Sequence, residues 1–324
     1  MRITLNNFNI SKREKISFEV KPNILRIISA LVATGVLFGV LVFSFNEGDK
    51  KDEILSNDDY PVTVLGVKIT EAPQKVVVLS PFIEDVLRTL NYENILVGKA
   101  DECTNSKVSN IPFVGSQFDP DIEKIKSLQP DIILNEVPLS YEQTKLLENE
   151  NIKIFTFKKA SDFAELGELY TDIGSLLGGA NTGYKNAAIC ANSIYLSIQE
   201  INKLIPEDGN SISACYMYDT EGTVVTGDTL SSNLIEFSGA DNIARYSTDY
   251  NIDINLIIQQ NPQYIFCKPG LLNKIKQDPN LSNIDAVKNS NVYEMDSNLI
   301  EAQDNKIIDA VIFMVSIMYP ELVT

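Results

Sequence analysis

Short apolar runs alternate with segments of helical spacing along most of this chain, and this alternation constrains the fold more than any other feature. The apolar run at residues 76–79 is followed by helical spacing at 82–90, and the run at 132–134 by helical spacing at 139–148. Apolar runs of this length, without polar alternation, are typical of parallel strands buried on both faces. The sequence therefore predicts an α/β fold with mainly parallel sheets.

Residues 161–204 interrupt the alternation, because their apolar residues recur at helical intervals and include no strand-like run. Gly178, Gly179 and Gly183 are expected to bend or interrupt this helix. The alternation resumes after Pro206. The pattern predicts two α/β lobes, at residues 60–160 and 205–324, joined by a long helix.

Residues 27–46 carry no charge and are nearly all apolar or small. A helix of about twenty residues is about 30 Å long and matches the hydrocarbon thickness of a bilayer. Basic residues dominate the preceding segment, 1–26, whereas acidic residues follow in 47–59. The positive-inside rule then predicts a single-pass anchor in the cell membrane, with 1–26 in the cytoplasm and 47–59 as an acidic tether to an extracellular domain.

Two other interpretations of the apolar run are open. A cleaved signal peptide is the main competitor, but the run is long for a signal peptide and residues 43–46 offer no cleavage site of small residues. A bacterial lipoprotein would need a cysteine directly after the run, and the first cysteine is Cys103. The sequence therefore favours an uncleaved transmembrane helix.

The composition excludes several kinds of chemistry. There is no histidine, so Ser-His-Asp and Cys-His nucleophiles, HExxH zinc sites and histidine-ligated haem or transition metals are ruled out. A net charge of −17 argues against nucleic-acid binding. Cys215 and Cys267 fall in strand-like runs and are expected to be buried free thiols. We expect no resident metal or cofactor.

Several short motifs follow one another in a fixed order along residues 60–321. They are Ala72-Pro-Gln-Lys-Val-Val-Val-Leu-Ser80, Leu96-Val-Gly98, Ile111-Pro-Phe-Val-Gly115, Asp121-Ile-Glu123, Leu128-Gln-Pro-Asp-Ile-Ile133, Ile173-Gly-Ser-Leu-Leu-Gly178, Thr226-Gly227, Leu234-Ile-Glu-Phe-Ser-Gly-Ala-Asp-Asn-Ile243, Asn261-Pro-Gln-Tyr-Ile265 and Ala286-Val-Lys-Asn-Ser-Asn-Val-Tyr293. In this order they resemble the substrate-binding proteins of ABC importers for cobalamin, ferric siderophores and haem. The resemblance implies two Rossmann-like lobes bridged by a spine helix, with a ligand held in a cleft between the lobes.

Open α/β sheets bind ligands at the carboxyl ends of their strands, so the candidate ligand contacts lie just past strand ends. These candidates are Ser80, Pro81, Phe82, Phe118, Tyr218, Gly227, Tyr250 and Asn298. The four aromatic residues among them would offer flat apolar faces to a macrocycle or chelate. Each of the four could equally be a packing residue, because much of any protein surface is apolar.

The residue types that are scarce or absent narrow the range of possible ligands. Only Arg88 and Arg245 follow the apolar run, which is few for an anionic ferric catecholate or carboxylate. Haem could use a tyrosine oxygen but would find no histidine partner. The sequence therefore favours a neutral or weakly charged ligand, such as a corrinoid or a ferric hydroxamate.

The resemblance also implies docking residues, because in this family a carboxylate on each lobe pairs with arginines of the permease. Glu123 occupies the matching place on the first lobe. On the second lobe the matching place is Asn255, and Asp253 lies two residues earlier. Glu123 could also be an ordinary first-turn carboxylate favoured by the helix dipole.

We therefore expect a monomeric, membrane-anchored extracellular solute-binding protein and not an enzyme. It would capture an iron-siderophore, a corrinoid or a related chelate and deliver it to an ABC permease. A ligand-binding sensor or scavenging receptor without transport is the first alternative, and Asn255 in place of a carboxylate encourages it. A carboxylate-based extracellular hydrolase, such as a glycosidase, is a second alternative that no motif supports.

Overall fold

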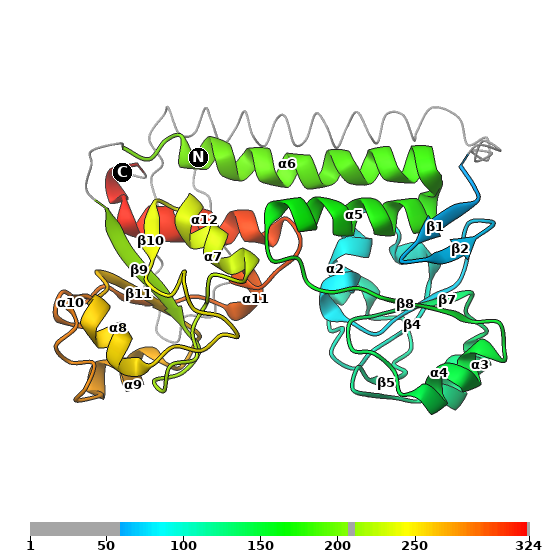
Figure 1. Cartoon of the computed structure of the whole chain (residues 1–324), viewed down its shortest axis with the longest axis horizontal. Coiled ribbons are helices and arrows are strands. Elements are labelled where there is room, and N and C mark those ends of the chain that lie inside the picture. Colours follow the sequence, from blue (N-terminus) through cyan, green and yellow to red (C-terminus); the bar gives the residue numbers. More distant parts are fainter. Residues whose placement is uncertain (1–58, 207–210, 323–324) are drawn as a thin grey trace. The chain divides into compact units, whose positions relative to one another are not determined.

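The computed structural model describes residues 59–206 and 211–322 (Figure 1). The predicted cytoplasmic segment 1–26, membrane anchor 27–46 and tether residues 47–58 lie outside these ranges. Among the described residues, no helix has the length and apolar character needed to cross a bilayer. The described chain divides into an N-terminal unit, residues 59–194 and 302–305, and a C-terminal unit, residues 195–301 and 306–322.

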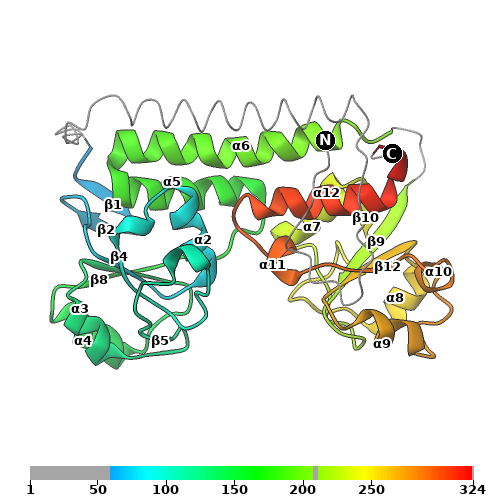
Figure 2. The same ribbon diagram turned by 180° about the vertical axis from the view of Figure 1, so that it is seen from behind.

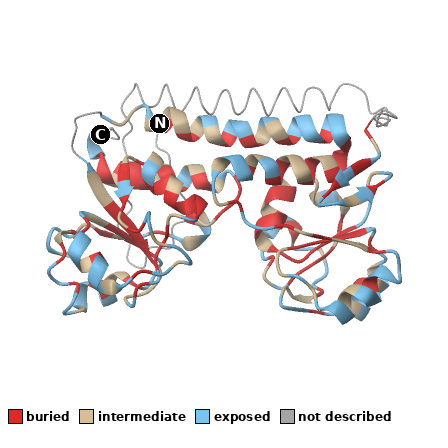
Figure 3. Cartoon of the chain, viewed as in Figure 1, coloured by how far each residue is buried: buried red, intermediate tan, exposed pale blue. Residues whose placement is uncertain are grey.

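A four-stranded parallel sheet forms the centre of the N-terminal unit, in the order β4-β3-β7-β8. Its strands are β3 (Val76–Val78), β4 (Leu96–Lys99), β7 (Ile132–Asn135) and β8 (Lys153–Thr156). All residues of β3 and β7 are buried, and Figure 3 shows buried stretches in the sheet of this unit. Its helices before β8 are α2 (Pro81–Thr89), α3 (Ile122–Leu128) and α4 (Tyr141–Glu148), with two 3₁₀ turns at Glu93–Ile95 and Ser106–Val108. Two antiparallel pairs join β1 (Val62–Val64) to β2 (Val67–Ile69) and β5 (Gly115–Ser116) to β6 (Asp119–Pro120). The remaining helices of the unit follow β8.

The C-terminal unit holds a second four-stranded parallel sheet, in the order β10-β9-β11-β12. Its strands are β9 (Ile212–Met217), β10 (Ala240–Asn242), β11 (Tyr264–Cys267) and β12 (Val292–Glu294). Its helices are α7 (Leu230–Phe237), α8 (Ile254–Gln260), α9 (Leu272–Gln277), α10 (Asp285–Lys288), α11 (Ser297–Ile300) and α12 (Lys306–Met318), followed by a 3₁₀ turn at Pro320–Leu322. Figure 2 shows α7 against α12. The predicted α/β fold with parallel sheets is confirmed.

The two sheets share one topology, because in each the first strand of the sheet lies between the second and the third. The helices α3 and α8 also match, although the sequence shows no obvious repeat. Asp121 and Asp253 cap them by accepting backbone N–H groups. Gln129 and Asn261 end them at φ values of 50° and 48°, and in both cases a proline and then a strand follow.

The predicted long helix over residues 161–204 is two helices in the structure. α5 (Phe163–Gly178) and α6 (Tyr184–Asn202) are joined by a π-helical turn at Gly179–Gly183. Gly179 takes a φ of +89°, which glycine adopts without strain and which ends α5. The glycines that were expected to bend the helix therefore reverse the chain.

Close packing of the paired helices depends on another glycine. A β-carbon at Gly174 in α5 would lie 2.4 Å from the Ala187 Cβ and 2.5 Å from the Gly183 carbonyl oxygen. The two helices run side by side in both ribbon views (Figures 1 and 2). Only a residue without a side chain allows this approach.

Asp59 fastens the first described residues to the turn between α5 and α6. Its carboxylate accepts the Asn181 and Thr182 N–H groups at 3.0 and 2.9 Å and the Thr182 hydroxyl at 3.1 Å. The residue is 1% exposed. Asp59, predicted to end the tether, therefore belongs to the folded N-terminal unit.

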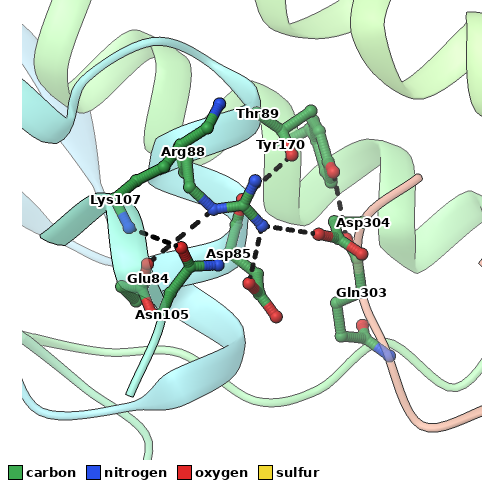
Figure 4. Close-up of polar contacts among 9 residues, drawn as sticks. All are labelled: Glu84, Asp85, Arg88, Thr89, Asn105, Lys107, Tyr170, Gln303 and Asp304. Atoms are coloured by element: carbon green, nitrogen blue, oxygen red, sulfur yellow. Dashed lines mark hydrogen bonds and ion pairs between the residues drawn. The ribbon is translucent and has the colours of Figure 1, made fainter. Parts of the chain in front are cut away.

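A network around Arg88 holds residues 302–305 in the N-terminal unit (Figure 4). The Arg88 guanidinium in α2 lies 2.8 Å from Asp85, 3.1 Å from the fully buried Asp304 and 3.8 Å from Glu84. Burial lowers the pKa of Arg88, but Asp85 and the other two carboxylates outweigh burial and raise it. The Tyr170 hydroxyl donates to the Gln303 carbonyl at 3.0 Å. The Arg88 cation thus holds residues 302–305, a segment distant in sequence from α2.

The glycine contact predicts opposite effects for two substitutions in α5. Gly174→Ala should lower the free energy of unfolding by about 1–3 kcal/mol, because the new methyl group overlaps Ala187 and the turn. Gly167→Ala is the matched control, since nothing lies within 4 Å of its Cβ position, and should raise stability by about 0.5–1 kcal/mol. Urea unfolding measures both. Equal effects of the two substitutions would contradict the packing described.

The Arg88 network predicts a large loss of stability on removal of its cation. Arg88→Met should cost about 3–5 kcal/mol, because it leaves the buried Asp304 carboxylate without its guanidinium. Lys203→Met removes the exposed ion pair with Glu200 and should change stability by at most about 0.5 kcal/mol. Denaturant titration of both variants tests this. A loss at Arg88 no larger than at Lys203 would refute the structural role of the network.

Candidate functional site

The shared strand order creates one switch point in each unit. A switch point is the place where the chain leaves the first strand of the sheet, between two neighbouring strands whose connections run in opposite directions. Open α/β sheets bind ligands outside the carboxyl ends of strands at such points. In the N-terminal unit the switch point follows β3, between β4 and β7, and in the C-terminal unit it follows β9, between β10 and β11.

Ser80 and Phe82 lie at the N-terminal switch point, but their side chains are buried. Ser80 is the N-cap of α2, with Pro81 following at the first helical position. The Ser80 hydroxyl makes no capping bond and instead donates to Glu136, which directly follows β7, at 3.2 Å. The side chains of Ser80 and Phe82 are therefore not exposed for ligand contact in this structure, and Glu136 is a polar group that sequence reasoning missed.

Phe118 is the most exposed predicted contact of this unit, with 70% of its surface accessible. It lies in the tight turn between β5 and β6, and its N–H donates to the Ser116 hydroxyl at 3.2 Å. Glu102 holds the turn by accepting the Ser116 hydroxyl at 2.6 Å and the Gln117 N–H at 2.9 Å. Burial raises the pKa of Glu102, but these hydrogen bonds outweigh it and lower the pKa. The Glu102 carboxylate thus fixes the turn in which the Phe118 ring is exposed.

Two further residues of this edge, Lys99 and Phe113, were missed by sequence reasoning. Lys99 ends β4, next to β3, and its ammonium lies 4.5 Å from the centroid of the Phe113 ring. Phe113 is 44% exposed. The signal that could have found Lys99 is its place at the end of a predicted apolar run, directly after Gly98.

Tyr218, Tyr250 and Glu301 meet at the switch point of the C-terminal unit. The Tyr218 hydroxyl donates a short hydrogen bond to one Glu301 oxygen, and the Tyr250 hydroxyl donates to the other at 3.1 Å. The two rings pack edge to face with centroids 5.8 Å apart. The Ser231 hydroxyl also lies 3.2 Å from Glu301. The structure therefore brings two of the predicted contacts together around one carboxylate.

Burial and the Glu301 charge raise the pKa of Tyr218 far above its ordinary value. The neighbouring Tyr216 ring lies 5.0 Å from Tyr218, and its hydroxyl donates to the Met295 carbonyl at 2.8 Å. Burial also raises the pKa of Tyr216. The phenols of Tyr216 and Tyr218 are therefore held in their protonated form, and Glu301 accepts hydrogen bonds from the hydroxyls of Tyr218, Tyr250 and Ser231.

Gly227 positions Tyr250 through the backbone. A β-carbon at Gly227 would lie 1.8 Å from the Arg245 carbonyl oxygen, so the loop that carries Tyr250 approaches closely here. The Tyr250 N–H donates to the Thr226 hydroxyl at 3.0 Å, and Tyr250 has a φ of 56°. Asn298 is exposed in α11, three residues before Glu301. Gly227 is thus a packing residue beside the cluster.

The three predicted docking residues lie at the starts of α3 and α8. Glu123 has a side chain that is 79% exposed and forms an ion pair with Lys126 at 3.2 Å. It also lines a surface hollow of about 590 Å³ together with residues at the ends of α3 and α4. Asp253 caps α8 and accepts the backbone and side-chain N–H groups of Asn255 at 2.8 and 3.0 Å. Asn255 occupies the position in α8 that Glu123 occupies in α3.

The described residues include no group of three or more His, Cys, Asp or Glu side chains that could hold a metal ion. The two switch points carry different chemistry. The N-terminal edge has exposed phenyl rings, one of them against the ammonium of the buried Lys99, whereas the C-terminal edge has phenols and a carboxylate. Such surfaces are suited to stacking and hydrogen bonding with a flat ligand.

Comparison with known proteins gives three results. A family model described as "Periplasmic binding protein" matches residues 76–299. The chain is 26% identical over 290 residues to an "Uncharacterized ABC transporter substrate-binding lipoprotein" of Bacillus subtilis, YvrC, covering 85% of this chain and 92% of the relative.

Two solved structures share the fold at low sequence identity. A possible iron-binding (periplasmic solute-binding) protein of Staphylococcus epidermidis has a TM-score of 0.65 and 17% identity, covering 77% of this chain and 100% of that one. A periplasmic heme binding protein of Pseudomonas aeruginosa has a TM-score of 0.65 and 18% identity, covering 76% and 93%. At this identity the likeness concerns the fold.

The raised pKa of Tyr218 predicts how stability depends on pH. Because the pKa is higher in the folded state, the contribution of Tyr218 is complete below pH ~10 and falls as the pH rises above that value, by at most about 1.4 kcal/mol per pH unit. Tyr218→Phe should therefore flatten the decline of the free energy of unfolding between about pH 10 and 11.5. Tyr246→Phe, at a side chain 88% exposed, is the control and should keep the wild-type slope. Identical slopes for Tyr218→Phe and wild type would show that the phenol is not buried against Glu301.

Proposed function

The chain belongs to the periplasmic binding protein family, and from this membership we propose that it is the membrane-anchored, extracellular solute-binding component of an ABC importer. Its ligand is a metal chelate, such as a ferric siderophore, a haem or a corrinoid, which it delivers to a permease. The curated relative from Bacillus subtilis carries the name of an ABC transporter substrate-binding protein, which supports the transport role.

The observation that carries this proposal is the pair of matched switch points. Each parallel sheet ends in aromatic and polar side chains at the place where open α/β sheets bind ligands. At the C-terminal edge Glu301 accepts hydrogen bonds from Tyr218 and Tyr250, so it anchors the two rings at this edge. Anchored rings at the ligand-binding edge of the sheet support a binding role.

The names of similar proteins support the proposal that the ligand is a metal chelate. The Staphylococcus epidermidis structure is named as a possible iron-binding protein, and the Pseudomonas aeruginosa structure as a heme-binding protein. Flat, partly apolar chelates fit the exposed Phe118 and Phe113 rings and the edge-to-face pair of Tyr218 and Tyr250.

The anchor is proposed to be the apolar helix at residues 27–46. The Bacillus subtilis relative is named a lipoprotein, whereas in this chain no cysteine stands directly after the apolar run, and the first one is Cys103. A transmembrane helix and a lipid both hold the domain at the membrane surface, so the two proteins would reach one arrangement by different means.

The permease contact is proposed to be unsymmetrical. Glu123 is highly exposed and can meet a permease arginine, whereas Asp253 is engaged in capping α8, and Asn255 carries no charge. Charge complementarity mainly accelerates and orients docking, so one carboxylate gives weaker steering than two. If one carboxylate is insufficient, the same body acts as a sensor or scavenging receptor that binds without transport.

Equilibrium titration of the full chain in detergent tests the binding role. Because the chain has no tryptophan and 13 tyrosines, quenching of tyrosine emission reports a bound chelate. Haemin, a ferric hydroxamate, a ferric tris-catecholate and cyanocobalamin are the probes, and at least one should bind with a Kd of about 1 µM or below. Tyr250→Ala should weaken that binding at least about tenfold by removing a ring and a hydrogen-bond donor to Glu301.

Tyr184→Ala is the matched control, because Tyr184 is 49% exposed at the start of α6, which does not follow a strand of either sheet. It should leave the affinity unchanged. Absence of binding to all four probes would overturn the proposed function. Binding without cellular uptake of the bound chelate would replace transport by the sensor role.

A further inference from the structure

Lys99 is a buried ammonium without a carboxylate partner. The residue is 1% exposed, and within residues 59–206 and 211–322 no carboxylate oxygen lies within 4.0 Å of its Nζ atom. The group that lies against it is the Phe113 ring, with its centroid 4.5 Å away. The face of an aromatic ring attracts a cation but compensates only part of the lost hydration.

Other buried charges of the N-terminal unit are compensated. Arg88 lies among three carboxylates, and the Asp59 carboxylate accepts two backbone N–H groups and one hydroxyl. This unit belongs to a chain with 44 acidic residues, so carboxylates are abundant. Among the residues that the structure describes, Lys99 therefore has no ionic partner, although carboxylates pair with other buried charges of this unit.

The position of Lys99 points to where a partner comes from. Lys99 is the last residue of β4 and lies in register with Val78, two residues before Ser80. It is thus at the switch point of the sheet, beneath a ring that is 44% exposed. The ammonium therefore lies against an exposed ring at the edge of the sheet where a ligand would bind.

We propose that Lys99 is the anion subsite of the ligand-binding edge and that the ligand is an anionic chelate. A carboxylate or catecholate oxygen of the ligand pairs with the ammonium, and the Phe113 ring moves aside and stacks on the ligand. This inference rests on the proposed function and assigns its ligand class. It reverses the sequence-based preference for a neutral or weakly charged ligand, which rested on the small number of arginines.

Titration of full-length protein with matched probes tests the subsite. The anionic probes are haemin, with two propionates, and a ferric tris-catecholate, with three negative charges; the others are ferrioxamine B, with one positive charge, and cyanocobalamin, which is neutral. Wild type should bind an anionic probe most tightly, with an affinity that falls as salt is raised. Lys99→Met should weaken that binding about tenfold to hundredfold and abolish most of the salt dependence.

Two variants separate charge from structure. Lys99→Arg keeps the positive charge and should retain most of the affinity and the salt dependence. Lys107→Met removes an exposed lysine from the same β4–β5 connection and should behave as wild type. Should Lys99→Met fail to fold, the ranking of the four probes by wild type and by Lys99→Arg still decides the matter.

The outcomes separate this inference from the proposed function. Selective loss of anionic binding in Lys99→Met supports the subsite. Equal wild-type affinity for anionic and uncharged probes, tighter binding of an uncharged or cationic probe, or an equal loss for all of them in Lys99→Met overturns the subsite and leaves the binding function standing. Binding of none of the four probes overturns both.

Discussion

The strand order of the two parallel sheets is the constraint on which the rest of the structure depends. In each sheet the first strand lies between the second and the third, so the connections on its two sides leave in opposite directions. Loops from distant parts of the sequence then gather at one edge. This is how Ser80 meets Glu136, and how Tyr218 and Tyr250 meet Glu301, which follows Tyr218 by 83 residues.

Hydrogen bonds and ion pairs made by residues outside this edge of each sheet then hold the loops in place. Glu102 holds the turn that presents Phe118, and Thr226 and Gly227 hold the loop that carries Tyr250. Buried polar groups of this kind are costly unless they are paired, so they specify one arrangement of the loops. Preformed loops lower the entropy that a ligand must overcome on binding.

The α/β class, the parallel sheets and the bounds of several elements could be predicted from the sequence, because buried strands and amphipathic helices leave clear patterns. The predicted runs at residues 76–79 and 132–134 correspond to β3 and β7, and the helical spacing at 82–90 corresponds to α2. The reversal between α5 and α6 could not be predicted, because it depends on Gly174 meeting Ala187, a contact between two helices. Of the candidate site, Tyr218 and Tyr250 were found from their places after strands, whereas Lys99 was missed because a lysine at a strand end is usually solvated.

Hydrogen exchange of the full chain, with and without a saturating chelate that binds, tests the central claim most directly. The ligand should slow the exchange of the backbone amides after β3 and β4 in the N-terminal unit. It should also slow the exchange of the amides in the loops around Tyr218 and Tyr250 in the C-terminal unit. Slowed exchange confined to one unit, or located at the amino ends of the strands, would contradict the claim.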